Sequence, residues 1–505
     1  MKTSTLIRIA IILAIFLALE LLARSGLVRP GLILPPSVML QELWSLMHTG
    51  KFWVEVGSSA RSILIAFVLA MTVGSIAAVV LHNLPRLRES VEPLIASYYA
   101  LPFFVLYPLL VVLMGMNQAP IIAIGFLYAV MAVIVGTLSG LDRIPMVLRR
   151  TARVYRMSPL QQALRISIPA AAPYVFTGAK LAIGYSITGV LGSEFILADS
   201  GFGYEVSFAY NNFEDRKMYA LLLFLLAVVS LLTMAIYRAE KLVQHRSGPA
   251  VAEAERKPVS SASKLLAALA VACIIIAIWQ IVHLRVGDEA LASPLVTFKH
   301  LFVLLGTTRF WGHIAETASA LVLAIMISCI LGTLVGVMLG LNRMASEVSS
   351  PMLVTLYSLP KVALYPLVLL FVGIGMASKV TFGAMYGTIP MILITMNAMA
   401  SMNPSFRQTA RVLQLSRAQT IGTIVVPAAI PEIVTGIRVS FSITLLGVMI
   451  GEMFASTRGL GFLIMNSINV NDTSTMMAVT ILIAVFAVTI NATLIAIERR
   501  INHAG

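Results

Sequence analysis

Long apolar runs separated by short polar segments recur along the whole chain. Each run has about 20 residues, the length a helix needs to cross about 30 Å of hydrocarbon. Backbone groups in lipid must bond within their own segment, so each run is expected to be a helix. The pattern predicts an all-α polytopic membrane protein with about 12 transmembrane helices. The predicted spans are 5–23, 57–81, 93–114, 119–140, 174–198, 217–237, 264–284, 315–340, 351–373, 377–398, 432–455 and 476–497.

Composition supports a lipid environment for most of the surface. Of 505 residues, 59% are hydrophobic and 11% are charged, whereas soluble domains carry about 25% charged residues. The net charge of +14 would also fit a nucleic-acid-binding protein. However, Lys and Arg accumulate in cytoplasmic loops for topological reasons. The membrane interpretation is therefore favoured, and no nucleic-acid partner is expected.

The basic residues also predict the orientation of the chain. They gather in the loops after spans two, four and six, which all lie on one side. The positive-inside rule makes this side the cytoplasm, so both termini are expected to be cytoplasmic. Lys2 and Arg8 before the first apolar run would also fit a signal peptide. Because an equivalent run at 264–284 lies in the middle of the chain, a retained helix is favoured.

The two halves of the chain are related by a constant offset of 258 residues. This offset pairs Pro36 with Pro294 and Glu89 with Glu347, without a gap between them. It predicts a first domain at 1–242, a cytoplasmic linker at 243–263 and a second domain at 264–505. Each half has an even number of spans, so both insert in the same direction. Parallel repeats of this kind enclose a pathway around an axis along the membrane normal.

A long polar loop lies between the fourth and fifth spans of each half. Ser158 with Gln161, and Ser416 with Gln419, have the spacing of a capping box and predict a short helix. We expect this helix to end before Pro169 or Pro427, giving a helix–turn–helix at the cytoplasmic face. Such a hairpin could anchor the fifth span at the membrane surface, or it could be a docking element for a cytoplasmic partner.

The two loops, RTARVYRMSPLQQALRISIPAAAP and QTARVLQLSRAQTIGTIVVPAAIP, resemble the EAA motif of ABC importer permeases. The segments SLPKVALYPLVLLFVGIG and VMIGEMFASTRGLGFLI are similar to permeases of the nitrate/sulfonate/taurine type. This resemblance implies two fused six-helix permease domains in a bacterial inner membrane. It also implies a cytoplasmic ABC ATPase dimer, an external substrate-binding protein and a small, often anionic solute.

The resemblance assigns ATPase docking to the two loops and shows two departures from the family motif. Arg150 and Gln408 replace its acidic residue, and Arg156 and Gln414 replace its glycine. The second replacement is expected to produce a different turn, at a cost of about 1 kcal/mol. The implied docking residues are Arg150, Thr151, Ala152, Arg153, Arg156, Ser158, Gln408, Thr409, Ala410, Arg411, Gln414 and Ser416.

The sequence contains no motif for catalysis or metal binding. It has no G-x-x-x-x-G-K-[ST] loop for ATP phosphates and no nucleophile–base pattern. Its two cysteines lack CxxC spacing, and its histidines form no pair at ligand spacing. The chain is therefore not expected to be an enzyme or to hold a metal or cofactor. ATP and magnesium are expected on the partner ATPase.

Lys361 is predicted to lie within the ninth span, where a lysine costs about 2.5–3.5 kcal/mol unless paired or hydrated. It could face the pathway and attract an anion, or it could snorkel or pair structurally. Glu194 and Glu452 lie near the outer ends of spans five and eleven. An outer-gate or packing role is favoured for them over direct contact with the solute.

Spans three and nine contain prolines that should distort them, namely Pro102, Pro108, Pro360 and Pro366. Tyrosines beside these prolines could line a cavity, or they could pack in the core; they are Tyr99, Tyr107, Tyr357 and Tyr365. An ion-coupled secondary transporter of six-plus-six design would also show parallel halves and a central linker. It would have no reason to repeat the long hairpin, so the ABC permease is favoured.

Overall fold

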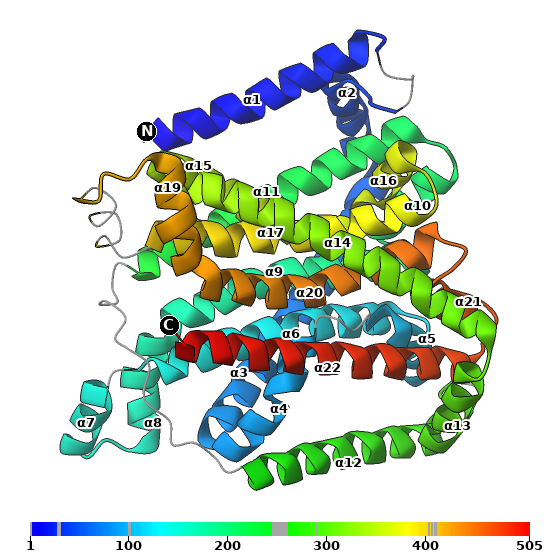
Figure 1. Cartoon of the computed structure of the whole chain (residues 1–505). Coiled ribbons are helices and arrows are strands. Elements are labelled where there is room, and N and C mark those ends of the chain that lie inside the picture. Colours follow the sequence, from blue (N-terminus) through cyan, green and yellow to red (C-terminus); the bar gives the residue numbers. More distant parts are fainter. Residues whose placement is uncertain are drawn as a thin grey trace.

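In the computed structural model the chain forms two parallel helical halves, and both chain ends lie at the same end of the molecule (Figure 1). The structure describes residues 3–27, 32–98, 103–144, 146–244, 261–288, 290–401 and 412–504, together with Ser405 and Gln408. These residues contain helices and no strand, which confirms the all-α prediction. The predicted linker lies mostly outside the described residues, since one half ends at Gln244 and the next helix begins at Ser261.

The first half contains α1 (Thr3–Arg24), α2 (Pro36–Met47), α3 (Gly50–Asn83), α4 (Pro85–Ser97), α5 (Tyr107–Met114), α6 (Gln118–Asp142), α7 (Met146–Val154), α8 (Pro159–Gln162), α9 (Ile168–Leu197), α10 (Phe202–Asn211) and α11 (Asp215–Gln244). The second half contains α12 (Ser261–Val286), α13 (Pro294–Leu305), α14 (Thr308–Leu341), α15 (Arg343–Ser358), α16 (Tyr365–Val372), α17 (Met376–Ser401), α19 (Arg417–Thr420), α20 (Val426–Ala455), α21 (Leu460–Asn469) and α22 (Thr473–Ala504). The same order of long and short helices in both halves follows from the sequence repeat.

Ten of the described helices are long and apolar enough to cross a membrane. They correspond to all the predicted spans except the third and the ninth, which are broken. In the second half, α15 ends at Ser358, and a 3₁₀ turn, η4 (Lys361–Leu364), leads into α16. The two parts of this span meet at an angle of 84°. Pro360 lies at the break and Pro366 lies at the start of α16, where its missing N–H costs no helical bond.

The hairpins between the fourth and fifth spans begin as predicted and end differently. The Ser158 N–H donates to Gln161 Oε1 at 3.1 Å, and the Gln161 N–H donates to Ser158 Oγ at 3.2 Å. This reciprocal pair confirms the capping box. The expected end before Pro169 is wrong, because a π-turn, η3 (Ala163–Ser167), joins α8 directly to α9. Pro169 then occupies the first turn of α9, where proline is tolerated.

The second half repeats this arrangement. The N–H groups of Ser416 and Gln419 donate to each other's side-chain oxygens at 2.9 and 3.3 Å. A second π-turn, η5 (Ile421–Val425), joins α19 to α20, so the predicted end before Pro427 is wrong for the same reason. A π-turn widens the helix by one residue and accommodates the proline ring without ending the helix. Each hairpin therefore continues directly into a core span.

The first span of each half packs on the opposite half. Helix α1 contacts α15, and α12 contacts α4; Figure 1 shows α1 and α12 on opposite sides of the molecule. Arg8 of α1 donates through Nη2 to the Glu347 carbonyl of α15 at 3.3 Å, and Arg499 of α22 pairs with Glu92 of α4 at 3.2 Å, so the halves also touch beside these helices. The interface between the halves is therefore covered on both sides by these crossing helices.

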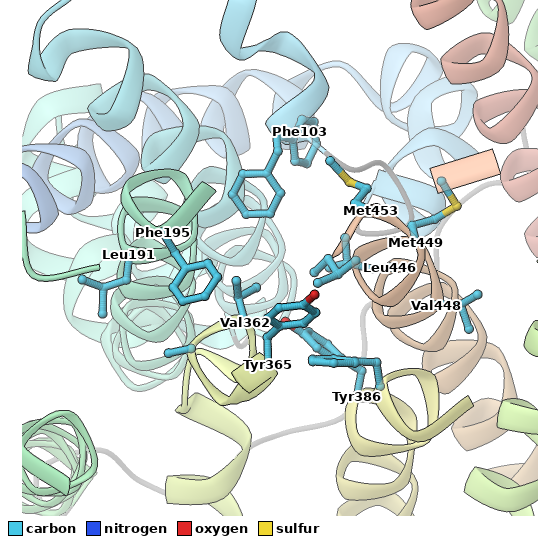
Figure 2. Packing of buried hydrophobic residues seen from close by; sticks show 14 of the residues in the cluster. Phe103, Leu191, Phe195, Val362, Tyr365, Tyr386, Leu446, Val448, Met449 and Met453 are labelled. Carbon is cyan, nitrogen blue, oxygen red and sulfur yellow. The ribbon is translucent and has the colours of Figure 1, made fainter. Parts of the chain in front are cut away.

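The core between the halves is filled by apolar side chains from both of them. Figure 2 shows Phe195 of α9, Tyr365 of α16 and Leu446 of α20 directed toward one another. The rings of Phe195 and Tyr365 lie 6.2 Å apart with an edge-on geometry, which aromatic pairs favour. Helices α9 and α20 are thus the central helices of the two halves, and they define the middle of the molecule.

Candidate functional site

A cavity of about 30 Å³ lies at the centre of the molecule, between the two halves. Such a volume has room for a few water molecules. Its walls come from α6, α9, α15, α17 and α20, together with the turn at Lys361. The residues that line it are Tyr128, Leu181, Gly184, Tyr185, Thr188, Tyr357, Leu359, Lys361, Tyr386, Ile443 and Leu446. The offset of 258 residues relates Tyr128 to Tyr386, so the cavity lies on the pseudo-two-fold axis.

Lys361 contributes a buried ammonium group to this cavity. Its side chain is only 5% exposed. Its Nζ donates to the Tyr357 carbonyl at 3.1 Å and lies 5.2 Å and 4.9 Å from the ring centroids of Tyr357 and Tyr386. It pairs with none of the carboxylates in the described part of the chain. A buried charge costs several kcal/mol unless it is compensated, and here the carbonyl and the two rings provide part of that compensation.

The four tyrosines proposed from the sequence have different surroundings. Tyr357 lines the cavity, and its hydroxyl lies 2.7 Å from that of Tyr185 across the interface between the halves. Tyr365 packs on aromatic rings and donates to the Phe454 carbonyl, so its contacts are those of a core residue. Tyr107 packs, half-buried, against the core of the first half. Tyr99 and Pro102 lie outside the described residues.

Four other polar residues of the cavity were not among the sequence candidates, namely Tyr128, Tyr185, Thr188 and Tyr386. Tyr128 and Tyr386 form a repeat-related pair, and the repeat could have identified them. Their hydroxyl groups are buried and donate to no acceptor in the described part of the chain. Tyr185 lies in the middle of α9, and its counterpart at the same offset is Ile443. No sequence pattern predicts that Tyr185 faces the cavity, because this depends on the rotation of α9 about its own axis.

Glu194 and Glu452 lie away from the cavity, at the ends of α9 and α20. Each is fully buried. The hydroxyl of Thr317 donates to the two carboxylate oxygens of Glu452 at 2.9 and 2.8 Å, and the Gly461 N–H donates at 2.9 Å. The equivalent residues of the first half, Ser59 and Gly203, make the same bonds to Glu194. Both carboxylates therefore anchor the short helix that follows the span.

The glycine before each short helix permits this anchoring. Gly459 has φ of +124°, a conformation that side chains rarely adopt. A Cβ atom there would lie 2.3 Å from the Glu452 carboxyl carbon. Gly201 has φ of +105° and the same close approach to Glu194. The G-x-G segments are thus explained by packing on a buried carboxylate.

An ion pair near Glu452 exists only in the second half among the described residues. Lys379 is 1% exposed, and its Nζ lies 2.8 Å from Glu316 and 4.0 Å from Glu452. It also donates to the Arg458 carbonyl at 2.9 Å. At the offset of 258, the first half has Ile121 in place of Lys379 and Ser58 in place of Glu316. The ends of the two halves at which Glu194 and Glu452 lie are therefore held together differently.

The two hairpins expose apolar tips at the same end of the molecule, where both termini also lie (Figure 1). Val154 is 79% exposed and Val412, its counterpart, is 80% exposed. Arg156 and Gln414 both have φ of 47°, so the expectation of a different turn is wrong. The left-handed conformation is kept, and the Met157 N–H donates to the Ala152 carbonyl at 3.0 Å, as at a glycine C-cap. The strain of a non-glycine residue remains.

The other residues proposed for ATPase docking differ in how far they are exposed to solvent. The exposed ones are Arg150, Ser158, Gln408 and Ser416. Thr151 is partly buried, and Ala152 is buried. Arg153 lies on α7. Thr409, Ala410 and Arg411 lie outside the described residues. The exposed members of the set thus lie on the surface of the hairpins, while Ala152 fixes α7 to the rest of the fold.

Comparison with known proteins identifies the family of this chain. The model of the binding-protein-dependent transport system inner membrane component matches it twice, at residues 70–247 and 328–504. The chain belongs to this family. The permease carries the family domain once in each half, which agrees with the repeat and with two fused permease domains. It is a multi-pass membrane component of an ABC transport system, and the family is one of transport proteins rather than enzymes.

Relatives of the permease include proteins described for several solutes. It is 29% identical to the putative aliphatic sulfonates transport permease protein SsuC of Bacillus subtilis over 50% of this chain and 92% of that protein. It is 26% identical to the taurine transport system permease protein TauC of Escherichia coli over 44% of this chain and 84% of the relative. A nitrate import permease protein of Leptolyngbya laminosa is 24% identical over 40% of this chain and 75% of the relative. Each of these alignments covers half of this chain or less.

Proposed function

We propose that this permease forms the whole translocation pathway of an ATP-driven importer for a small, anionic solute. The observation that supports this most directly is the pair of matched hairpins at one end of two parallel halves that enclose a central cavity. Relatives described for aliphatic sulfonates and for nitrate support an anionic solute. The alternative of an ion-coupled secondary transporter is not favoured, because the family is that of binding-protein-dependent systems.

The hairpins are proposed to dock on a cytoplasmic ABC ATPase dimer. Their exposed apolar tips, Val154 with Tyr155 and Val412 with Leu413, would fit a hydrophobic groove on each ATPase subunit. Because α8 and α19 continue through a π-turn into α9 and α20, a movement of either hairpin would be transmitted along a central helix. Closing of the ATPase dimer would bring the hairpins together and rock the halves between outward and inward access.

The orientation follows from this docking. The end with the hairpins and both termini is proposed to face the cytoplasm of a bacterial cell, in agreement with the basic loops at that end. The opposite end, with α10 and α21, would receive an external substrate-binding protein. Lys361 would attract the anion to the middle of the pathway. The cavity is too small for an organic solute, so the structure corresponds to a closed pathway that opens when the halves separate.

The docking is tested by placing a charge on both hairpin tips. The V154D/V412D variant should lose co-purification with the partner ATPase by at least 30-fold, since a hot-spot residue contributes about 2 kcal/mol or more. Met116, which is 90% exposed at the opposite end, provides the matched control M116D. Both variants should elute as the unchanged chain does in size-exclusion chromatography. ATPase binding that survives V154D/V412D would refute the docking.

A further inference from the structure

Two turns at the end of the molecule opposite the chain termini are held by side chains that accept three consecutive backbone N–H groups. Each turn leads into a short helix, α10 or α21 (Figure 1). In the first half the bonds run from Gly201 to Glu55, from Phe202 to Ser59 and from Gly203 to Glu194, at 2.6, 2.8 and 2.9 Å. In the second half they run from Gly459 to His313, from Leu460 to Thr317 and from Gly461 to Glu452, at 3.0, 2.8 and 2.9 Å. These acceptors fix where each short helix begins.

One of the three acceptors differs in its chemistry between the halves. The offset of 258 residues pairs Glu55 with His313, whereas a hydroxyl group and a carboxylate are kept at the other two positions. His313 accepts through Nδ1, so this nitrogen carries no hydrogen while the bond to Gly459 exists. A carboxyl group keeps an acceptor oxygen whether or not it is ionised. Of the two turns, the second is therefore the one that depends on the protonation state of an imidazole.

The imidazole of His313 is enclosed by the turn that it holds. His313 is 6% exposed, and its ring is stacked with that of Phe462 of α21, with the centroids 6.1 Å apart and the planes 11° apart. A protonated imidazole carries a hydrogen on both nitrogens. Its Nδ1–H would then point at the Gly459 N–H, which leaves two donors facing each other without an acceptor. Because an unsatisfied buried donor costs free energy, the protonated ring does not fit the turn.

The charged groups around the imidazole have other partners or carry the same charge as a protonated ring. Arg309 and Glu316 lie on the same helix, α14, and Arg458 lies on the turn. Glu316 pairs with Lys379 of α17 at 2.8 Å, and Lys379 also donates to the Arg458 carbonyl at 2.9 Å. Glu452 of α20 already accepts an N–H of the turn, and α21 contributes no charged residue. A proton on the imidazole would therefore meet two arginines and a carboxylate that is already paired.

We propose that His313 is a proton-sensitive positioning residue, which holds the start of α21 when it is neutral and releases it when it is protonated. Release takes up a proton, so it is favoured as the pH falls. For an imidazole with an ordinary pKa of about 6.5, the equilibrium constant for release should rise about tenfold between pH 7.5 and pH 5.5. This pH response goes beyond the proposed function and does not depend on it. In the proposed orientation, acid outside the cell would loosen α21 while α10 stays in place.

The test is amide hydrogen exchange of the purified full-length permease in lipid nanodiscs, measured by mass spectrometry at pH 7.5 and pH 5.5. The rates are corrected for the intrinsic exchange rate at each pH, so that they report protection by structure. Between the two pH values, the protection of residues 459–463 should fall about tenfold more than that of residues 201–205. The comparison isolates His313, because Glu194 and Glu452 accept equivalent bonds and their titration would affect both turns.

The repeat provides matched variants in both directions. H313N keeps an acceptor oxygen on a side chain that does not titrate, so the second turn should stay protected at both pH values. H313A removes the acceptor and should lower the protection of this turn equally at both. E55H gives the first half the residue of the second, so residues 201–205 should gain a fall of about tenfold.

Each variant should elute as the unchanged chain does in size-exclusion chromatography. C273A, on an exposed site of α12, is the control and should change neither turn. Three results would each overturn the role of His313: equal pH dependence of the two turns in the unchanged chain, a pH dependence that survives H313N, or no gain of pH dependence in E55H. None of these results bears on ATPase docking, which the hairpin variants test separately.

Discussion

Replacing Glu452 by alanine tests whether the buried carboxylates are structural anchors. Glu452 is fully buried and accepts hydrogen bonds from the Thr317 hydroxyl and the Gly461 N–H. Without the carboxylate, both donors are left buried and unsatisfied, at about 1–3 kcal/mol each. E452A should therefore destabilise the permease by about 2–6 kcal/mol. E452Q keeps one oxygen acceptor and should lose about half as much.

The measurement is equilibrium unfolding of the purified permease in micelles, followed by the fluorescence of its four tryptophans. E194A, at the equivalent position of the first half, should give a loss of similar size, because Ser59 and Gly203 make the same bonds there. E347A is the control, because that carboxylate is half-exposed and, among the described residues, pairs with Arg343 one turn away. Its loss should therefore stay below about 1 kcal/mol. Unchanged stability together with abolished solute uptake in E452A would show that the carboxylate serves the solute, and would refute the anchoring argument.

Three further sets of substitutions probe other parts of the fold. K379I should cost about 3–5 kcal/mol by leaving Glu316 unpaired. The K379I/E316S variant has the residue types that the first half carries at Ile121 and Ser58. It should regain most of the lost stability, as measured by a double-mutant cycle of unfolding free energies. R156G and Q414G should each stabilise the permease by about 1 kcal/mol by removing strain at φ of 47°, read as a higher unfolding midpoint. Burial raises the pKa of Glu205, but the hydrogen bonds and charges of Lys217 and Lys51 outweigh burial, so its pKa lies below its ordinary value of 4.5. The stability from Glu205 should thus be present above pH 4.5 and lost as the pH falls through the lowered pKa, and E205Q should remove this acid dependence of the unfolding midpoint.

The sequence predicts the scaffold well because its signals are local or repeated. Apolar runs determine where helices cross lipid, and the capping boxes at Ser158 and Ser416 formed as predicted. The break near Pro360 was also anticipated. The predicted helix ends before Pro169 and Pro427 failed, because a π-turn can relieve the clash that proline would otherwise cause.

The cavity was less predictable, because its lining depends on helix rotation and on contacts between distant segments. Lys361 was recognised because a charge in a span is costly. Tyr185 was missed because a tyrosine in an apolar helix has many ordinary packing roles. The left-handed turn at Arg156 was misjudged for another reason: the hydrogen bonds of the turn maintain its geometry even without glycine.

The fusion of the two halves explains why the permease can be symmetric in one place and asymmetric in another. Two identical subunits would place the same residue on both sides of the axis, so a lysine at position 361 would bring two ammonium groups to one cavity. With both halves in one chain, Lys361 is matched by Phe103, and Tyr185 by Ile443. The hairpin tips keep matched exposed valines, as an ATPase dimer of two equal subunits would require. The repeat therefore differs around the cavity, while its exposed hairpin tips and buried carboxylates remain equivalent.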